Sequence, residues 1–131
     1  MELMARVLIL EPDEEIRELF SHMLTRLGHE PLTSAEEAGS CDVILLEPAW
    51  EPGVALTWRL RHERRDLPVI AASVLSSPPG GASPLPVVRH LVKPFTLVQL
   101  ADAVAEALFR RPEGQRGPAT GGASGSGALR F

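Results

Sequence analysis

Acidic, hydroxyl and ammonium side chains stand at the carboxyl ends of four apolar segments in this sequence. They are the acids Glu11, Asp13 and Glu47, the hydroxyl of Ser73 and the amine of Lys93. In an open α/β sheet, the carboxyl ends of parallel strands meet at one edge, where the loops fan apart and binding sites form. Such a set of groups at one edge is suited to phosphoryl chemistry.

The segment that would position Glu47 spans residues 41–48. Residues 43–46 are all apolar, and Asp42 and Glu47 flank them. A short strand without polar positions is typical of a parallel sheet that is covered on both faces. Glu47 therefore ends a buried strand. Cys41, the single cysteine, cannot form an internal disulfide, and we expect it to be a small core residue.

Four further segments have the composition of strands. They are residues 6–10, a weaker segment at 29–33, and residues 67–73 and 87–92. The weak segment contains Pro31, which has no backbone donor, so we place it near an edge of the sheet. Residues 6–10 should lie beside 42–47.

Helical patterns separate these strands. Asp13 is the expected cap of a helix that Gly28 ends, with an apolar stripe formed by Ile16, Leu19, Phe20, Met23, Leu24 and Leu27. Residues 34–39 predict a short capped helix. A third helix should run from about residue 54 to 63, with Leu56 and Leu60 facing the sheet.

The last helix follows Lys93. Thr96 and Gln99 form a capping box, and the apolar stripe extends to about Arg110. Residues 74–86 hold several prolines and glycines, which predicts a long loop. Residues 111–131 are rich in Gly, Ser and Pro and predict a flexible tail, so the domain should span residues 1–110.

The composition excludes several classes of function. Of the 131 residues, 44% are hydrophobic and 23% charged, and the net charge of −4 gives no basic surface for nucleic acid. No apolar run approaches the ~20 residues that span a bilayer, and the first residues lack the basic start of a signal peptide. We expect a soluble, cytoplasmic protein. The histidines lack metal-ligand spacing, so no metal site is expected.

Taken in order, these pieces resemble the receiver domain of two-component response regulators over residues 5–109. Residues 7–19 resemble its opening strand, acidic turn and first helix, and 42–47 its phosphoacceptor strand. Residues 68–73 resemble the strand with the switch hydroxyl, and 91–95 the lysine motif. The resemblance implies a flavodoxin-like (CheY-like), doubly wound, five-stranded parallel sheet of order 2-1-3-4-5, here with the fourth helix shortened or lost. It also implies a cis Lys93–Pro94 bond.

The sequence departs from that family at its phosphorylation site. Glu47 stands where receivers carry the phosphorylated aspartate, and its extra methylene displaces the carboxylate from the position for in-line attack. Glu11 and Pro12 stand where an aspartate pair holds magnesium, and proline offers no side-chain oxygen. We therefore expect weak magnesium binding or none, and no other cofactor. His90 stands at the aromatic switch position.

We interpret the chain as a degenerate receiver, or pseudo-receiver, in which Lys93 pairs with Glu47. Without magnesium, Lys93 is the nearest cation that can offset Glu47, Glu11 and Asp13. Two alternatives remain for Glu47. It could imitate a phosphorylated aspartate, with Ser73 donating to it, or it could simply end a strand.

The expected function is a phosphorylation-independent protein-interaction module of bacterial signal transduction, and not an enzyme. Trp50 and Trp58 are candidate partner contacts, a histidine kinase is one candidate partner, and two copies could pair through the last helix. One alternative is an atypical phosphoacceptor that uses Asp13 or Asp42. The other is a flavodoxin-like binder of a small anion, which the acidic first turn disfavours.

Overall fold

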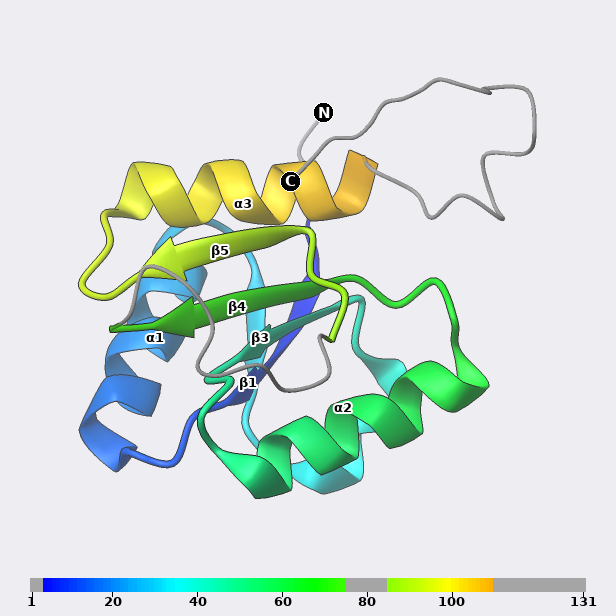
Figure 1. The fold of residues 1–131 in the computed structure, drawn as a ribbon. Helices are drawn as coiled ribbons and strands as arrows, with labels where there is room; N and C mark the ends of the chain where they lie inside the picture. Colours follow the sequence, from blue (N-terminus) through cyan, green and yellow to red (C-terminus); the bar gives the residue numbers. More distant parts are fainter. Residues whose placement is uncertain (1–3, 75–84, 110–131) are drawn as a thin grey trace.

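One parallel sheet organises the protein (Figure 1). The computed structural model describes residues 4–74 and 85–109. Its five strands are β1 (Arg6–Leu10), β2 (Glu30–Leu32), β3 (Val43–Leu46), β4 (Val69–Ser73) and β5 (Arg89–Val92). They pair in the order β2-β1-β3-β4-β5, and every pair is parallel. The fold class and strand order predicted from the sequence are confirmed, and Pro31 lies in an edge strand as expected.

Helices cover both faces of this sheet. The helices α1 (Glu14–Arg26) and α3 (Leu97–Phe109) lie on one face, where Phe20, Leu24 and Leu100 are buried. The short 3-10 helix η1 (Ala35–Ser40) and the helix α2 (Glu51–Glu63) lie on the other face. Figure 1 shows α3 and α2 on opposite sides of the strands. Cys41 is buried in the second core, as predicted.

The helix α1 begins and ends where the sequence predicts. The Asp13 carboxylate accepts hydrogen bonds from the backbone N–H groups of Glu15 and Ile16, and Gly28 follows the helix with φ +89°. Leu19 does not belong to the buried stripe: 54% of it is exposed, because α1 meets the sheet through the narrower set around Phe20 and Leu24.

Two helices differ from the expectation in start or type. α2 begins at Glu51, three residues before the predicted start, because Pro52 occupies its first turn, where a missing backbone donor costs nothing. Its most buried positions are Gly53 and Thr57, while Leu56 and Leu60 are half-buried. The segment near residues 34–39 is a 3-10 helix, capped by Ser34.

The final βα unit follows its predicted course with a later strand start. β5 begins at Arg89 rather than at residue 87, and the Lys93–Pro94 bond is cis, as expected. The capping box is present, since Thr96 and Gln99 each donate a backbone N–H to the side chain of the other. Within the described residues no helix lies between β4 and β5; most of the predicted loop, residues 75–84, is outside the described part.

None of the described helices is long and apolar enough to cross a membrane.

Candidate functional site

The register of the sheet brings three distant residues to one edge. Leu10 of β1 is the partner of Leu46 of β3, so Glu11 and Glu47 leave the sheet side by side. Ser73 of β4 is the partner of Val92 of β5, which places Lys93 at the same edge. Phe95 fixes the turn after Lys93, because its ring packs against Phe20 of α1 with the ring centroids 5.0 Å apart.

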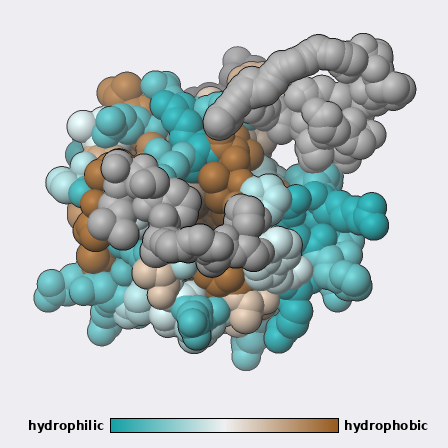
Figure 2. Space-filling model, viewed as in Figure 1, coloured by the Kyte–Doolittle hydropathy of each residue, from teal (hydrophilic) through white to brown (hydrophobic). Residues whose placement is uncertain are grey.

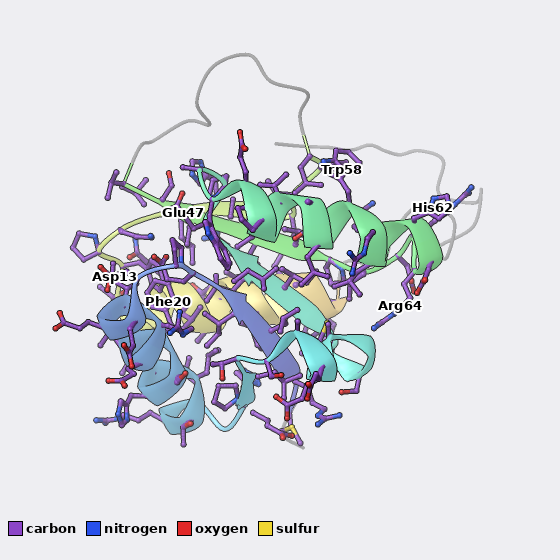
Figure 3. All side chains as sticks on the ribbon, turned by 90° about the horizontal axis from the view of Figure 1, so that it is seen from below. Asp13, Phe20, Glu47, Trp58, His62 and Arg64 are labelled. Atoms are coloured by element: carbon purple, nitrogen blue, oxygen red, sulfur yellow. The ribbon has the colours of Figure 1, made fainter. Side chains whose placement is uncertain are left out.

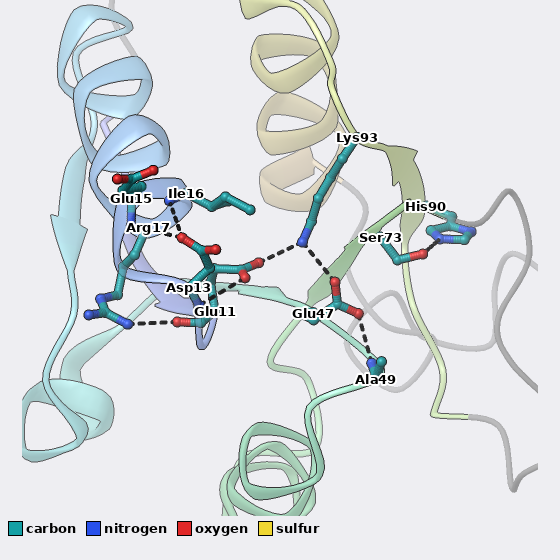
Figure 4. Close-up of polar contacts among 10 residues, drawn as sticks. All are labelled: Glu11, Asp13, Glu15, Ile16, Arg17, Glu47, Ala49, Ser73, His90 and Lys93. Carbon is teal, nitrogen blue, oxygen red and sulfur yellow. Dashed lines mark hydrogen bonds and ion pairs between the residues drawn. The ribbon is translucent and has the colours of Figure 1, made fainter.

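The ammonium group of Lys93 lies between the two glutamates (Figure 4). Its Nζ is 2.7 Å from Glu11 Oε1 and 2.7 Å from Glu47 Oε1. The side chains are 10% exposed for Lys93, 4% for Glu11 and 12% for Glu47, so this is a buried ion pair rather than a surface one. The pairing of Lys93 with Glu47 inferred from the sequence is present, and Glu11 is a second partner.

Every carboxylate oxygen of the two glutamates has a donor from the protein. Glu11 Oε2 accepts the backbone N–H of Asp13 at 3.2 Å, and Glu47 Oε2 accepts that of Ala49 at 2.8 Å. The side chain of Arg17 donates to the Glu11 carbonyl at 2.8 Å, which ties this turn to α1. Buried charges are tolerated when they are both paired and hydrogen-bonded, and this cluster satisfies both conditions.

The surroundings of Lys93 keep its amine protonated. Burial alone lowers the pKa of Lys93, but the hydrogen bonds and negative charges of Glu11 and Glu47 outweigh burial, so its pKa is raised overall. The ammonium form is therefore the species at neutral pH. One cation faces two acids, and the cluster carries a net negative charge when both are ionised.

The side chains at this edge do not fit a magnesium ion. Pro12 contributes no oxygen and is exposed, and the Asp13 carboxylate caps α1. The remaining acids, Glu11 and Glu47, hold the Lys93 amine between them. Magnesium needs near-octahedral oxygen ligands, which this set does not provide. Among the described residues, no group of three His, Cys, Asp or Glu side chains could hold a metal ion.

Ser73 and His90 are neighbours beside this cluster. Ser73 Oγ lies 3.4 Å from His90 Nε2; the Ser73 residue is buried and the histidine is half-buried. Figure 4 shows both on the β4–β5 side of the site, while Glu47 faces Lys93. The hydroxyl and the histidine predicted for the switch positions are therefore brought together.

The two tryptophans have different surroundings. Trp50 is half-buried and packs against the core, and its ring lies over Gly53, where an added Cβ would be 2.7 Å from Trp50 Cε3. The loop position expected for Trp50 is thus packed rather than open. Trp58 lies off the buried face of α2 and is 44% exposed.

Asp42 lies at the opposite end of β3 from Glu47. It precedes β3, and its Oδ2 accepts the backbone N–H of Arg6 at 2.8 Å. Asp13 is near the cluster but is used as a helix cap. Of the two alternative phosphoacceptors considered from the sequence, only Asp13 is close to Lys93.

Sequence reasoning missed two contributors to this region and one contact at the other end of β3. The N–H of Ala49 and the side chain of Arg17 bond at the site, and Arg64 donates to the Cys41 carbonyl at 2.6 Å. Arg64 thereby ties the end of α2 to the start of β3. Backbone donors and carbonyls leave no signal in the side-chain sequence.

No protein-family model matches this sequence, and no curated protein matches it either. Solved structures do resemble it. NtrX from Brucella abortus, in complex with ADP, is 24% identical with a TM-score of 0.65, over 81% of this chain and 26% of that one. The chemotaxis protein CheY4 of Vibrio cholerae is 24% identical with a TM-score of 0.63, over 80% of this chain and 99% of that one.

A third similar structure is the histidine kinase ThkA in complex with the response regulator TrrA. It gives 24% identity and a TM-score of 0.64, over 82% of this chain and 99% of the matched one. This chain therefore has the fold of response regulator receiver domains. It spans the whole of CheY4 but about a quarter of NtrX.

Proposed function

We propose that this chain is a pseudo-receiver, a phosphorylation-independent protein-interaction module of bacterial signal transduction. The observation that carries the proposal is the position of Lys93 Nζ, 2.7 Å from both Glu11 and Glu47. A permanent ion pair replaces the combination of metal ion and phosphorylatable aspartate. We propose no catalytic activity of its own.

The chemistry of Glu47 supports this reading. One of its oxygens accepts from Lys93 and the other from the N–H of Ala49, so attack on a phosphodonor would have to break a buried bond. The longer glutamate side chain also misplaces the attacking oxygen, and a displacement of about 1 Å can cost roughly 100-fold in rate.

Exposed apolar residues suggest where partners bind. Val87 and Val92 at β5 and Val98 and Phe109 on α3 are all exposed. Figure 2 shows patches of apolar surface among hydrophilic side chains on the face that includes β5. Because one similar structure is a complex of a histidine kinase with a response regulator, a signalling protein such as a kinase is the proposed partner class. We place the protein in the cytoplasm.

We also propose that residues 1–110 form the receiver-like domain and that 111–131, which lie outside the described residues, are a Gly-, Ser- and Pro-rich tail to it. A pull-down that compares the full chain with one ending at Arg110 tests whether the tail takes part in partner binding. Equal recovery of a partner by both forms is the expected result. Alternatively, two copies of the chain could pair through α3. The mass of the purified chain in solution distinguishes such a dimer from a monomer.

Incubation with acetyl phosphate and magnesium, followed by intact mass spectrometry, tests the central claim. We expect no phosphorylated species. Magnesium-dependent incorporation that disappears in Glu47→Ala would remove the proposal. Incorporation that disappears in Asp13→Asn or Asp42→Asn would instead favour an atypical phosphoacceptor.

A further inference from the structure

The outward face of α2 combines an aromatic side chain with basic ones. Trp58, Arg59 and His62 are exposed on the helix, and Arg65 is exposed just beyond its end. Figure 3 shows Trp58 and His62 on the side of α2 away from Arg64, which bonds to the start of β3. We call Trp58, Arg59, His62 and Arg65 the Trp58 surface.

Packing within the domain does not account for this tryptophan. The sheet-facing side of α2 is filled by Gly53 and Thr57, and Thr57 Oγ1 donates to the Gly53 carbonyl at 2.8 Å. Trp58 follows Thr57 and turns away from that contact, leaving 44% of it in solvent. Ala55, one turn earlier, is also exposed.

The charges around Trp58 have the opposite sign to the chain as a whole. Residues 59–66 contain four arginines against Glu63 and Asp66, whereas the chain carries a net charge of −4. Arg61 and Arg64 donate to main-chain carbonyls and so hold α2 in place. Arg59 and Arg65 form no ion pair with any carboxylate of the described residues.

We propose that the Trp58 surface binds an acidic peptide segment of a partner protein, which places an apolar side chain against the indole. Tryptophan and arginine are the residues that most often dominate binding energy at interfaces. The arginine fork pairs with carboxylates in a bidentate manner, and an unneutralised basic surface attracts an acidic segment over other partners. This inference rests on the proposed function, since it names the chemistry of the partner.

The Trp58 surface is also connected to the ion-pair cluster through the start of α2. The helix that carries Trp58 starts at Glu51, directly after Trp50, whose backbone N–H donates to the Glu47 carbonyl at 3.1 Å. Trp50 in turn packs over Gly53 in the first turn of α2. The cluster and the Trp58 surface are thus joined by one helix of fixed position.

Selection of short random peptides displayed on phage, against the full chain, tests the inference. The expected peptides are enriched in Asp and Glu and carry at least one aromatic or aliphatic residue. A synthetic peptide from the selection should lose about tenfold or more in affinity for Trp58→Ala and for the double variant Arg59→Glu with Arg65→Glu. Added salt should weaken binding as well.

Leu19→Ala is the matched control, because Leu19 is also exposed, but on α1 and outside both candidate partner surfaces. It should leave the affinity unchanged, and far-ultraviolet circular dichroism should show all variants folded. Peptides without acidic residues, or binding that survives Trp58→Ala, would overturn the inference. Loss of binding in Phe109→Ala alone would overturn it and leave the interaction module standing. Self-association of the chain that Trp58→Ala abolishes would also overturn it, since a second copy would be the occupant.

Discussion

Lys93 partly offsets the charges of two acids that the sheet brings together. Glu11 and Glu47 end neighbouring strands and are 4% and 12% exposed at the side chain, so neither charge can be left to solvent. A buried pair of this kind adds little net stability compared with apolar residues, but removing one partner leaves a buried charge uncompensated.

Lys93→Met should therefore lower the free energy of unfolding by about 3–5 kcal/mol at neutral pH. Urea-induced unfolding followed by circular dichroism measures the change. The combined variant Lys93→Met, Glu11→Gln, Glu47→Gln removes the charges on both sides and should recover most of the loss. Equal destabilisation of the single and combined variants would show that the lysine stem, and not its charge, is what the fold requires.

His29 makes the stability of the fold depend on pH. Its Nδ1 accepts the backbone N–H of Ala5 at 3.1 Å, and burial lowers its pKa. The folded state then binds a proton at His29 less readily than the unfolded state does. The contribution of neutral His29 to the free energy of unfolding is therefore complete above about pH 6.5, and it is lost as the pH falls through the pKa of His29 in the folded state. Titrating unfolding free energy from neutral to acid pH should show this loss.

His29→Asn keeps an acceptor but not the titration, so its stability should fall less with acid than that of the unchanged chain. His22→Asn is the matched control, because His22 is exposed on α1. A steeper loss in the His29 variant would contradict the assignment.

At the scale of single elements, the cap of α1 separates a structural role from a chemical one. The Asp13 carboxylate accepts two backbone N–H groups, at 2.9 and 3.2 Å. Asp13→Ala should cost about 1 kcal/mol in unfolding free energy, while Asp13→Asn should cost a few tenths, since asparagine also caps helices. Thermal and urea unfolding of the two variants test this. An equal cost would mean that the charge, rather than the cap, matters.

The first turn of α2 requires a glycine at position 53. A Cβ at Gly53 would lie 2.7 Å from Trp50 Cε3 and 3.1 Å from Leu46 Cδ1, so an indole ring or a core leucine would have to move. We expect Gly53→Ala to destabilise the fold by about 1–3 kcal/mol. Gly39→Ala, which meets nothing within 4 Å, should change stability by less than about 0.5 kcal/mol in the same urea titration.

The elements also show what the sequence could predict. Continuous apolar runs predicted β1 and β3, and the order of the polar residues after the strands predicted that Glu11, Glu47 and Lys93 would meet. The start of α2 was misplaced because Pro52 suits a loop and a first helical turn equally well. The exposure of Leu19 and the packing of Trp50 on Gly53 depend on how the layers meet, which periodicity in one segment does not report.

At the scale of the whole molecule, the site requires the complete sheet. Lys93 bonds to residues that are 82 and 46 positions away in the sequence, across β1, β3 and β5. Contacts at such separations form late, because the intervening chain must be ordered first. Lys93→Met should therefore speed unfolding, by roughly 100- to several-thousand-fold, and leave the refolding rate within about threefold. Stopped-flow measurements over a range of urea concentrations test this; slowed refolding with unchanged unfolding would contradict it.

The four carboxylate oxygens of Glu11 and Glu47 accept from three donor groups of the protein, which bears on how the proposed interaction module could be controlled. A phosphoacceptor needs a carboxylate oxygen that is free to attack the phosphodonor, whereas each carboxylate oxygen of Glu11 and Glu47 already accepts a hydrogen bond from within the protein. Under the proposed function, the amount of the protein, rather than its phosphorylation, would therefore set how much partner it binds.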